Sequence, residues 1–318
     1  MKRRPILLAG ISSVLSACTT TAPRVSATPA QLRKRDWTSF DGKTMPFTTW
    51  STPRGKKPRG IILAVHGLSG AASDFWPLGE SLRQRGITTY ALELRGQGND
   101  PQQAERGDIR DEKLWQRDLK TFHALLRQRH PRTPIFWYGE SLGSLVVMHT
   151  LAQISLADQP QGILLASPVA GLRMEVSAAQ RWMLETGAAV TPRTRLSLGT
   201  LAGVDESSIQ VTSTTTHGSQ MAKTPHHISA FSLRLIVAIG RMIDALPAAA
   251  AGLRQPLLVL ASPHDVISSP EQIQAFFDQI GSREKKLLWF TRSRHLILHD
   301  VQRVEALQDI IHWLEGQI

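Results

Sequence analysis

Short continuous apolar runs and longer stretches with apolar residues at helical spacing alternate along this 318-residue chain. Continuous runs are typical of strands buried on both faces of a parallel sheet, and the spaced pattern is typical of amphipathic helices. The apolar runs lie at Ile61–Val65, Ile87–Leu94, Ile135–Tyr138, Gly162–Ser167, Leu257–Ser262 and Lys286–Phe290. Helical patterns at 72–85 and 112–129 separate the first three of these runs. Strands alternating with helices indicate an α/β fold with a mostly parallel central sheet flanked by helices.

Two segments depart from this alternation. Residues 36–51 alternate around a Gly-containing turn and predict a hairpin before the first parallel strand. Between about residues 171 and 250 the strand–helix rhythm stops; a helical stretch, a Ser/Thr-rich passage and an apolar helix at Phe231–Leu246 follow one another. This insertion is too long for a simple crossover between strands. We interpret it as a mainly helical cap inserted after the sixth predicted strand.

The stretch Pro134–Ser155 contains the strongest chemical signal. The apolar run Ile135–Tyr138 enters Gly139-Glu140-Ser141-Leu142-Gly143, and apolar residues at helical spacing follow. A strand, a sharp turn carrying Gly-x-Ser-x-Gly and a helix form a nucleophile elbow. The turn raises the serine oxygen above the sheet, and the helix N-terminus places partial positive charge near the oxygen that becomes anionic. The pattern predicts that Ser141 is a nucleophile.

A serine hydroxyl needs a general base and an acid that orients the base. In a strand–elbow–helix architecture these partners follow the serine in the order acid, then histidine, each after a late strand. Asp265 follows the run Leu257–Ser262, and His295 follows Lys286–Phe290. We therefore predict that Asp265 orients His295, which takes the proton of Ser141 and returns it to the leaving group.

Three neighbours of these residues are weaker candidates. His264 lies on the loop that carries the acid, so it is misplaced for the base. His299 is expected to project outward from the C-terminal helix, and Asp300 is expected to be a local hydrogen-bonding partner.

Stabilisation of a tetrahedral oxyanion requires two backbone N–H donors. In this architecture one belongs to the residue after the nucleophile and the other to the loop after an early strand. Leu142 and Leu68 occupy these two positions. The alternative for His66-Gly67, which precedes Leu68, is a tight turn that simply requires glycine.

The N-terminal residues 1–17 read as an export signal, with three positive charges followed by a 13-residue mostly apolar run. The run is shorter than the about 20 apolar residues that span a bilayer. It ends in Leu15-Ser16-Ala17-Cys18, which resembles the bacterial lipobox, whose cysteine is diacylated. We predict lipidation of Cys18 and attachment to a bacterial cell membrane, at the periplasmic face or the outer membrane. The alternative is an ordinary secretory peptide in which the cysteine is coincidental.

The polar, proline-containing segment 18–35 is predicted to be an extended tether, or simply a disordered terminus, and 36–318 the folded domain. The formal net charge of +11 falls to +8 when the three positive charges of the signal are removed. A basic surface either attracts anionic membranes weakly or is only well solvated. Basic runs interleaved with aromatics are absent from the sequence, so we expect no nucleic-acid partner.

The cysteine and histidine content of the sequence argues against disulfides and metal sites. Cys18 is the only cysteine, so no disulfide forms within one chain. No cluster of His, Cys and carboxylates has metal-ligand spacing, and His226-His227 has no partners nearby in the sequence. We predict that the protein uses no metal and no cofactor.

The combined motifs resemble those of the α/β-hydrolase superfamily and, within it, the serine hydrolases grouped with monoacylglycerol lipases and lysophospholipases. The resemblance covers about residues 36–316 and is carried by His66-Gly67-Leu68-Ser69-Gly70, Leu94-Arg95-Gly96-Gln97-Gly98, Gly139-Glu140-Ser141-Leu142-Gly143, Asp265 and His295. Met221-Ala222-Lys223-Thr224-Pro225 lies where that group often has Met-x-x-Asp-Pro, although Thr224 replaces the Asp. Glu93 to Asp100 departs from the Asp-x-Arg-Gly-His-Gly-x-Ser of the group, and the Ser/Thr-rich middle of the cap matches none of its patterns.

The resemblance implies a serine hydrolase that cleaves carboxylic esters, as a lysophospholipase or monoacylglycerol lipase does, through an acyl-enzyme. Its substrate would be a small ester or a single-chain lipid. A peptidase or amidase and an acyltransferase remain open, because all use the same three residues. A lipid-anchored binding protein without catalysis is a further alternative. Ser141 argues against the enzymes of this fold that use an Asp nucleophile. The apolar faces of the cap either pack on the core or line an acyl tunnel.

Overall fold

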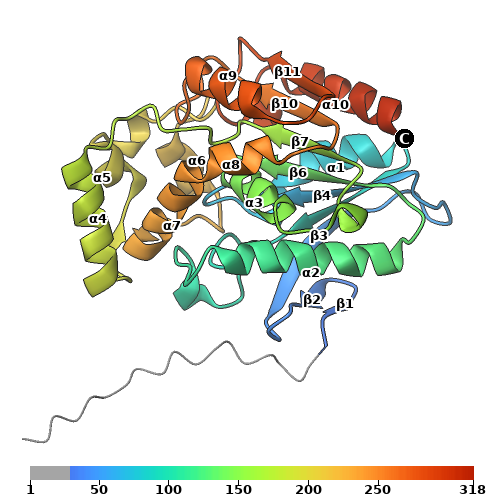
Figure 1. The fold of residues 1–318 in the computed structure, drawn as a ribbon, viewed down its shortest axis with the longest axis horizontal. Helices are drawn as coiled ribbons and strands as arrows, with labels where there is room; N and C mark the ends of the chain where they lie inside the picture. The colour runs from blue at the N-terminus through green and yellow to red at the C-terminus, as the bar shows by residue number, and fades with distance from the viewer. Residues whose placement is uncertain (1–28) are drawn as a thin grey trace, which may run out of the picture.

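The computed structural model describes residues 29–318 (Figure 1). The predicted export signal and Cys18 lie outside the described residues. Within 29–318, no helix is both long enough and apolar enough to cross a membrane.

A nine-stranded sheet forms the centre of the molecule, in the order β1-β2-β3-β5-β4-β6-β7-β10-β11. The strands are β1 (Gln31–Leu32), β2 (Asp36–Thr38), β3 (Thr44–Trp50), β4 (Gly60–Val65), β5 (Ile87–Leu92), β6 (Ile135–Glu140), β7 (Gly162–Ala166), β10 (Leu257–Ala261) and β11 (Lys285–Trp289). The pairings from β5 through β11 are parallel, whereas β1, β2 and β3 pair antiparallel, as does β3 with β5. The predicted mostly parallel α/β sheet is confirmed.

The N-terminal edge of the sheet begins earlier than the sequence indicated. Gln31 pairs with Thr38 and Leu32 with Trp37, so paired backbone starts inside the segment 18–35 that we interpreted as a tether. Because β1 precedes the predicted hairpin, the sixth predicted strand is β7 in the structure.

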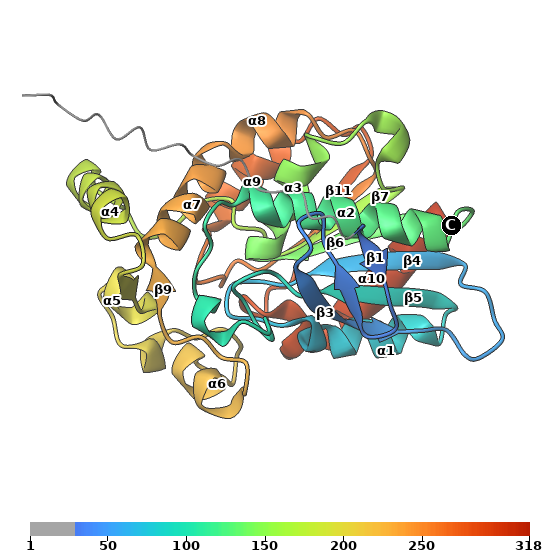
Figure 2. The ribbon, with the colours of Figure 1, turned by 90° about the horizontal axis from the view of Figure 1, so that it is seen from below.

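Helices cover both faces of the sheet. They are α1 (Trp76–Arg83), α2 (Lys113–Arg129), α3 (Leu142–Leu151), α8 (Leu246–Ala251), α9 (Pro270–Gln279) and α10 (Arg303–Gln317). Figure 2 shows α2, α3, α8 and α9 on one side and α1 and α10 on the other. Short 3-10 helices occur at η1 (Ala72–Phe75), η2 (Gln103–Glu105), η3 (Leu156–Asp158), η4 (Glu206–Ser208) and η5 (Ile297–His299).

The two helical layers explain the continuous apolar runs. In β4, Ile61, Leu63 and Val65 belong to the hydrophobic core beneath α2 and α3, while Ile62 and Ala64 belong to the core beneath α1 and α10. All five side chains are fully buried. A strand with apolar neighbours on both faces has no polar position, which is why these runs do not alternate.

The insertion between β7 and β10 lies beyond the carboxyl ends of the parallel strands, at the left of Figure 1. It contains α4 (Ala178–Val190), β8 (Arg195–Leu196), α5 (Leu198–Ala202), α6 (His217–Lys223), β9 (Phe231–Ser232) and α7 (Leu233–Asp244). The antiparallel pair β8–β9 was not predicted. The following helix α8 packs on α3 and returns the chain to the body of the fold.

Buried and partly buried polar contacts attach this cap to the body. Asp108 accepts hydrogen bonds from Ser232 Oγ and Arg234 Nε, both at 2.6 Å. His226 Nε2 lies 3.2 Å from Asp74 Oδ2. Both attachments join residues more than a hundred positions apart, so the cap is fixed to the body on two sides.

The motif around Arg95 is structural. Its guanidinium donates to Asp41 at 2.6 and 2.7 Å and to Asp118 at 2.5 and 2.8 Å. Burial raises the pKa of the Asp118 carboxyl, against the opposing effect of Arg95. Trp115 Nε1 donates to the Arg95 carbonyl at 2.9 Å. This cluster ties the β2–β3 turn to α2.

Candidate active site

The elbow between β6 and α3 holds Ser141 in a backbone conformation that L-residues rarely adopt, with φ 52° and ψ −120°. Its N–H donates to the Ala166 carbonyl at 3.1 Å. The flanking glycines are required by close packing: a Cβ on Gly143 would lie 2.0 Å from the Val65 carbonyl oxygen, and one on Gly139 would lie 2.7 Å from the Gly143 oxygen. The strained turn aims the serine side chain away from the sheet.

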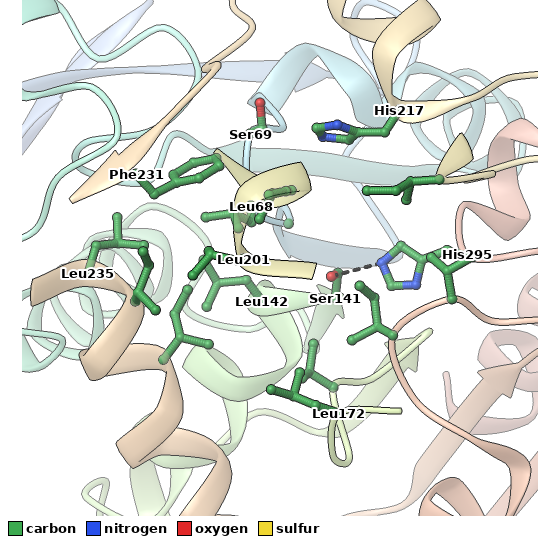
Figure 3. A pocket seen from close by; sticks show the side chains of 18 of the residues that line it. Leu68, Ser69, Ser141, Leu142, Leu172, Leu201, His217, Phe231, Leu235 and His295 are labelled. Atoms are coloured by element: carbon green, nitrogen blue, oxygen red, sulfur yellow. Dashed lines mark hydrogen bonds between the residues drawn. The ribbon is translucent and has the colours of Figure 1, made fainter. Parts of the chain in front are cut away.

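Three side chains that were predicted to act together lie in hydrogen-bonding contact. Ser141 Oγ is 2.9 Å from His295 Nε2, as Figure 3 shows, and His295 Nδ1 is 2.8 Å from Asp265 Oδ2. The second oxygen, Asp265 Oδ1, accepts from the backbone N–H of Ile267 at 2.7 Å and of Ser268 at 3.4 Å. The carboxylate is therefore fixed on one oxygen and free to orient the imidazole with the other.

His295 is buried, and its neighbours set both its position and its charge. The hydroxyl of Ser167, a residue with φ 44°, donates to the His295 carbonyl at 2.5 Å. Burial disfavours the imidazolium, but the charge and hydrogen bond of Asp265 outweigh it, so the pKa of His295 is raised above its ordinary value of 6.5.

The two predicted oxyanion donors lie beside the serine. Leu142 is the first residue of α3, so its N–H has no partner within the helix. Leu68 follows β4 in a loop that is packed closely on the elbow: a Cβ on Gly67 would lie 3.0 Å from Ser141 Cβ. Leu68, Leu142 and Ser141 line one cavity. The structure therefore brings both predicted donor residues next to the serine.

A buried pair that the sequence did not reveal braces the Leu68 loop. His66 Nδ1 donates to the Gly67 carbonyl at 2.8 Å, and His66 Nε2 lies 3.1 Å from Glu93 Oε1. Burial opposes the charged imidazole, but Glu93 raises the pKa of His66 above its usual value. Glu93 is the position where the resembling group has Asp, which is the one sequence signal that pointed here.

The three weaker candidates fall in different places. His264 is exposed. Asp300 accepts from the backbone N–H of Arg294 at 2.8 Å and of Ser213 at 3.0 Å, so it is the local partner that was expected. The expectation for His299 was wrong: it lies in η5, before the C-terminal helix begins, and lines the cavity.

A cavity of about 1260 Å³ opens above Ser141 and is walled mainly by the cap. Helix α7 separates two environments: Ala238 and Met242 are buried against the body, whereas Ile236 and Ile239 line the cavity. Residues of α7 therefore both pack on the body and line the cavity. Among residues 29–318, no group of three or more His, Cys, Asp or Glu is placed to hold a metal ion.

An elbow serine after β6, an acid after β10 and a histidine after β11 of a mostly parallel sheet define the α/β-hydrolase fold. The chain belongs to the Hydrolase_4 family, described as serine aminopeptidase, S33, whose model matches residues 56–302. The resemblance noted in the sequence is thereby confirmed.

Comparisons with individual proteins agree with this family. The chain is 21% identical over 257 residues to a carboxylesterase of Bacillus subtilis, covering 80% of this chain and 92% of the relative. It is 22% identical to an uncharacterised abhydrolase domain-containing protein of Dictyostelium discoideum over 87% of its own length, but spans only 28% of that protein. The crystal structure of a monoacylglycerol lipase of Paleococcus ferrophilus superposes with a TM-score of 0.72 at 20% identity, covering 86% of this chain and 99% of the lipase. These similarities show the fold.

Proposed function

We propose that this protein is a serine hydrolase that cleaves carboxylic esters through an acyl-enzyme intermediate. The observation that carries the proposal is the hydrogen-bonded series Ser141–His295–Asp265, at 2.9 and 2.8 Å, under a largely apolar cavity. Side chains from three separate loops do not adopt this arrangement for packing alone, because a buried histidine and carboxylate are costly to desolvate.

In the proposed reaction, Ser141 Oγ attacks the ester carbonyl carbon while its proton passes to His295 Nε2. The carbonyl oxygen becomes anionic and accepts hydrogen bonds from the N–H groups of Leu68 and Leu142. When the C–O bond breaks, His295 donates the proton to the departing alcohol and an acyl-serine remains. Water then attacks the acyl carbon while His295 takes one of its protons. As the bond between the acyl carbon and Ser141 Oγ breaks, His295 returns that proton to Ser141 Oγ, and the carboxylic acid is released. Asp265 keeps the imidazole in the tautomer that both steps need.

The cavity supports single-chain lipid esters, such as a monoacylglycerol or a lysophospholipid, as the substrate class. Apolar walls formed by Ile236, Ile239 and Leu201 suit an acyl chain. Each methylene moved from water into such a wall gains about 0.8 kcal/mol. The structural neighbour described as a monoacylglycerol lipase supports the same class.

A screen of hydrolysis across p-nitrophenyl esters from acetate to octanoate, monoacylglycerols, lysophospholipids and aminoacyl amides tests this proposal. If the methylene gain is carried into the transition state, kcat/KM rises several-fold with every two carbons. Ser141→Ala should remove turnover without changing the unfolding temperature. Activity that peaks at acetate and falls with length would contradict the lipid-ester assignment.

The family description favours a second candidate, an aminopeptidase. Such an enzyme needs an anionic partner for the substrate amine near the nucleophile. Glu140 is the carboxyl adjoining Ser141 in the cavity wall, but burial raises its pKa, which weakens it as a counter-ion. Faster turnover of aminoacyl amides than of octanoyl esters in the same screen would favour this candidate.

We further propose that Cys18 is acylated and holds the enzyme at a bacterial cell membrane. The support is the lipobox-like Leu15-Ser16-Ala17-Cys18 behind a charged, apolar leader. Cys18→Ser should move the full-length protein from the membrane fraction to the soluble fraction. Mass spectrometry that finds an unmodified Cys18 on the mature protein would contradict the proposal.

A further inference from the structure

One wall of the cavity above Ser141 is polar, in contrast to the apolar walls that face α7. Ser69, His217 and His227 all line it; we call these three residues the histidine corner. Ser69 lies on the loop that carries Leu68, and Figure 3 shows Ser69 and His217 on one side of Ser141, with Leu172 on the other. The histidine corner therefore adjoins the predicted oxyanion donors. Neither the triad nor the acyl-chain walls account for it.

Ser69 and His227 are joined by hydrogen bonds that fix one face of the corner. Ser69 Oγ accepts from the N–H of Ile228 at 3.1 Å and lies 3.1 Å from His227 Nδ1, but 3.4 Å from the Ile228 carbonyl. The shorter contact assigns the serine hydrogen to His227 Nδ1. In that tautomer, His227 Nε2 carries a hydrogen and is a donor. Ser69 itself is held at φ 60°, so the corner is built on strained backbone.

Two ring nitrogens of the corner are buried without a partner. Within the described part of the chain, neither His217 Nδ1 nor His227 Nε2 makes a hydrogen bond, and the two rings stand 5.8 Å apart, edge to face. A buried polar atom that lacks a partner costs about 1–3 kcal/mol. Orphaned atoms in a cavity wall are therefore expected to meet a bound polar molecule.

Both imidazoles are neutral at pH 7. Burial lowers the pKa of His227 to about 4, helped by the neighbouring His217, and burial also lowers the pKa of His217. Neutral imidazoles offer one donor and one acceptor each, which matches hydroxyl groups. They supply no positive charge to compensate a buried phosphate.

We propose that the histidine corner binds the alcohol portion of the ester, and that this portion is an uncharged polyol such as glycerol. The inference rests on the proposed function and narrows it, because it favours monoacylglycerols over lysophospholipids. The acyl chain takes the apolar walls, so the polar wall beside the oxyanion donors is left for the leaving group. His217 and His227 are then specificity-determining residues that hold the alcohol and take no part in bond breaking.

His217 gives the cleaner variant, because within residues 29–318 its buried Nδ1 has no hydrogen-bond partner that a substitution would leave unsatisfied. His217→Phe preserves a planar ring and removes both nitrogens, and His217→Asn keeps a polar atom near the position of Nδ1. His312→Phe, at an exposed position on α10, is the matched control. Binding of two ethers that cannot be hydrolysed, 1-O-octylglycerol and ethyl octyl ether, is measured by calorimetry on each full-length protein. Hydrolysis of 1-monooctanoylglycerol, ethyl octanoate and octanoyl lysophosphatidylcholine is measured in parallel.

We expect His217→Phe to weaken the binding of 1-O-octylglycerol about tenfold, which is the contribution of roughly one buried hydrogen bond. The affinity for ethyl octyl ether should change less than twofold. His217→Asn should recover part of the loss, and His312→Phe should behave as wild type. Equal effects on both ethers, no effect on either, or a wild-type preference for the lysophospholipid would overturn the proposal. Discrimination between the ethers without any ester hydrolysis would instead uphold the site and reject the proposed function.

Discussion

The charge of His295 is set by two opposing influences, and the balance has a kinetic consequence. Burial lowers its pKa and Asp265 raises it, with a net value above 6.5. General-base catalysis requires the neutral imidazole, so activity is lost as pH falls through this pKa. We predict an acidic limb of the kcat/KM profile that inflects above pH 6.5.

Replacing the acid tests the same balance. Asp265→Asn removes the charge that raises the pKa of His295, so the inflection should move to lower pH while kcat falls by up to about 10⁴. The pH profile of ester hydrolysis measures both effects. Asp300→Asn, which alters a carboxylate that accepts only from backbone N–H groups, is the control. A larger loss from Asp300→Asn would contradict the assignment of the acid.

Glycine at the elbow is a second requirement at the residue scale. A Cβ on Gly143 would lie 2.0 Å from the Val65 carbonyl oxygen, so Gly143→Ala forces strand and helix apart. We predict that the free energy of unfolding, measured in urea, falls by about 1–3 kcal/mol. Gly316→Ala in α10 is the control, because its Cβ meets no atom within 4 Å. An unchanged Gly143→Ala protein would show that the elbow packs less tightly.

The residues that the sequence identified differ from those it missed in how they are encoded. Ser141 lies in a Gly-x-Ser-x-Gly motif between a strand and a helix, so local sequence identified it. Asp265 and His295 each follow a strand that a continuous apolar run marks, so chain order identified them. The pair His66 and Glu93 was missed because each partner looks ordinary in its own segment. The histidine corner was missed for the same reason: its members meet only after the cap folds over the Leu68 loop.

At the scale of elements, apolar patterning predicted the parallel strands, because burial on both faces leaves no other composition. Short elements were not predictable in this way. Strands β1, β8 and β9 contain two residues each, which is too short to show a period, and their pairing depends on tertiary contacts. The cap position was recognisable only because the strand rhythm stopped.

Helix α7 permits a test of the cap. Ile239 lines the cavity, whereas its neighbours on the helix surface, Ala238 and Met242, are buried against the body. We predict that Ile239→Trp fills part of the acyl space, lowers kcat/KM for octanoyl esters at least about tenfold, and leaves acetyl esters within twofold. Equal losses of kcat/KM for both esters would mean that the substitution disturbs the catalytic residues and does not shorten the acyl space.

At the scale of the whole molecule, the sheet carries the reacting groups and the cap supplies the enclosure. Strands β4, β6, β10 and β11 all end at the same edge of the sheet. The residues that follow them therefore lie close together in space, although they are far apart in the sequence. The cap is fixed to the body through Asp108 and Asp74. These contacts join distant segments, and only the assembled fold reveals them.

The central claim is that Ser141 is the nucleophile of an acyl-enzyme reaction. Intact-mass analysis after exposure to a fluorophosphonate, followed by peptide mapping, tests it most directly. The account predicts one adduct per chain, on Ser141, with its rate reduced by His295→Ala and its formation abolished by Ser141→Ala. An adduct on another residue, or undiminished labelling of the Ser141→Ala protein, would contradict the account.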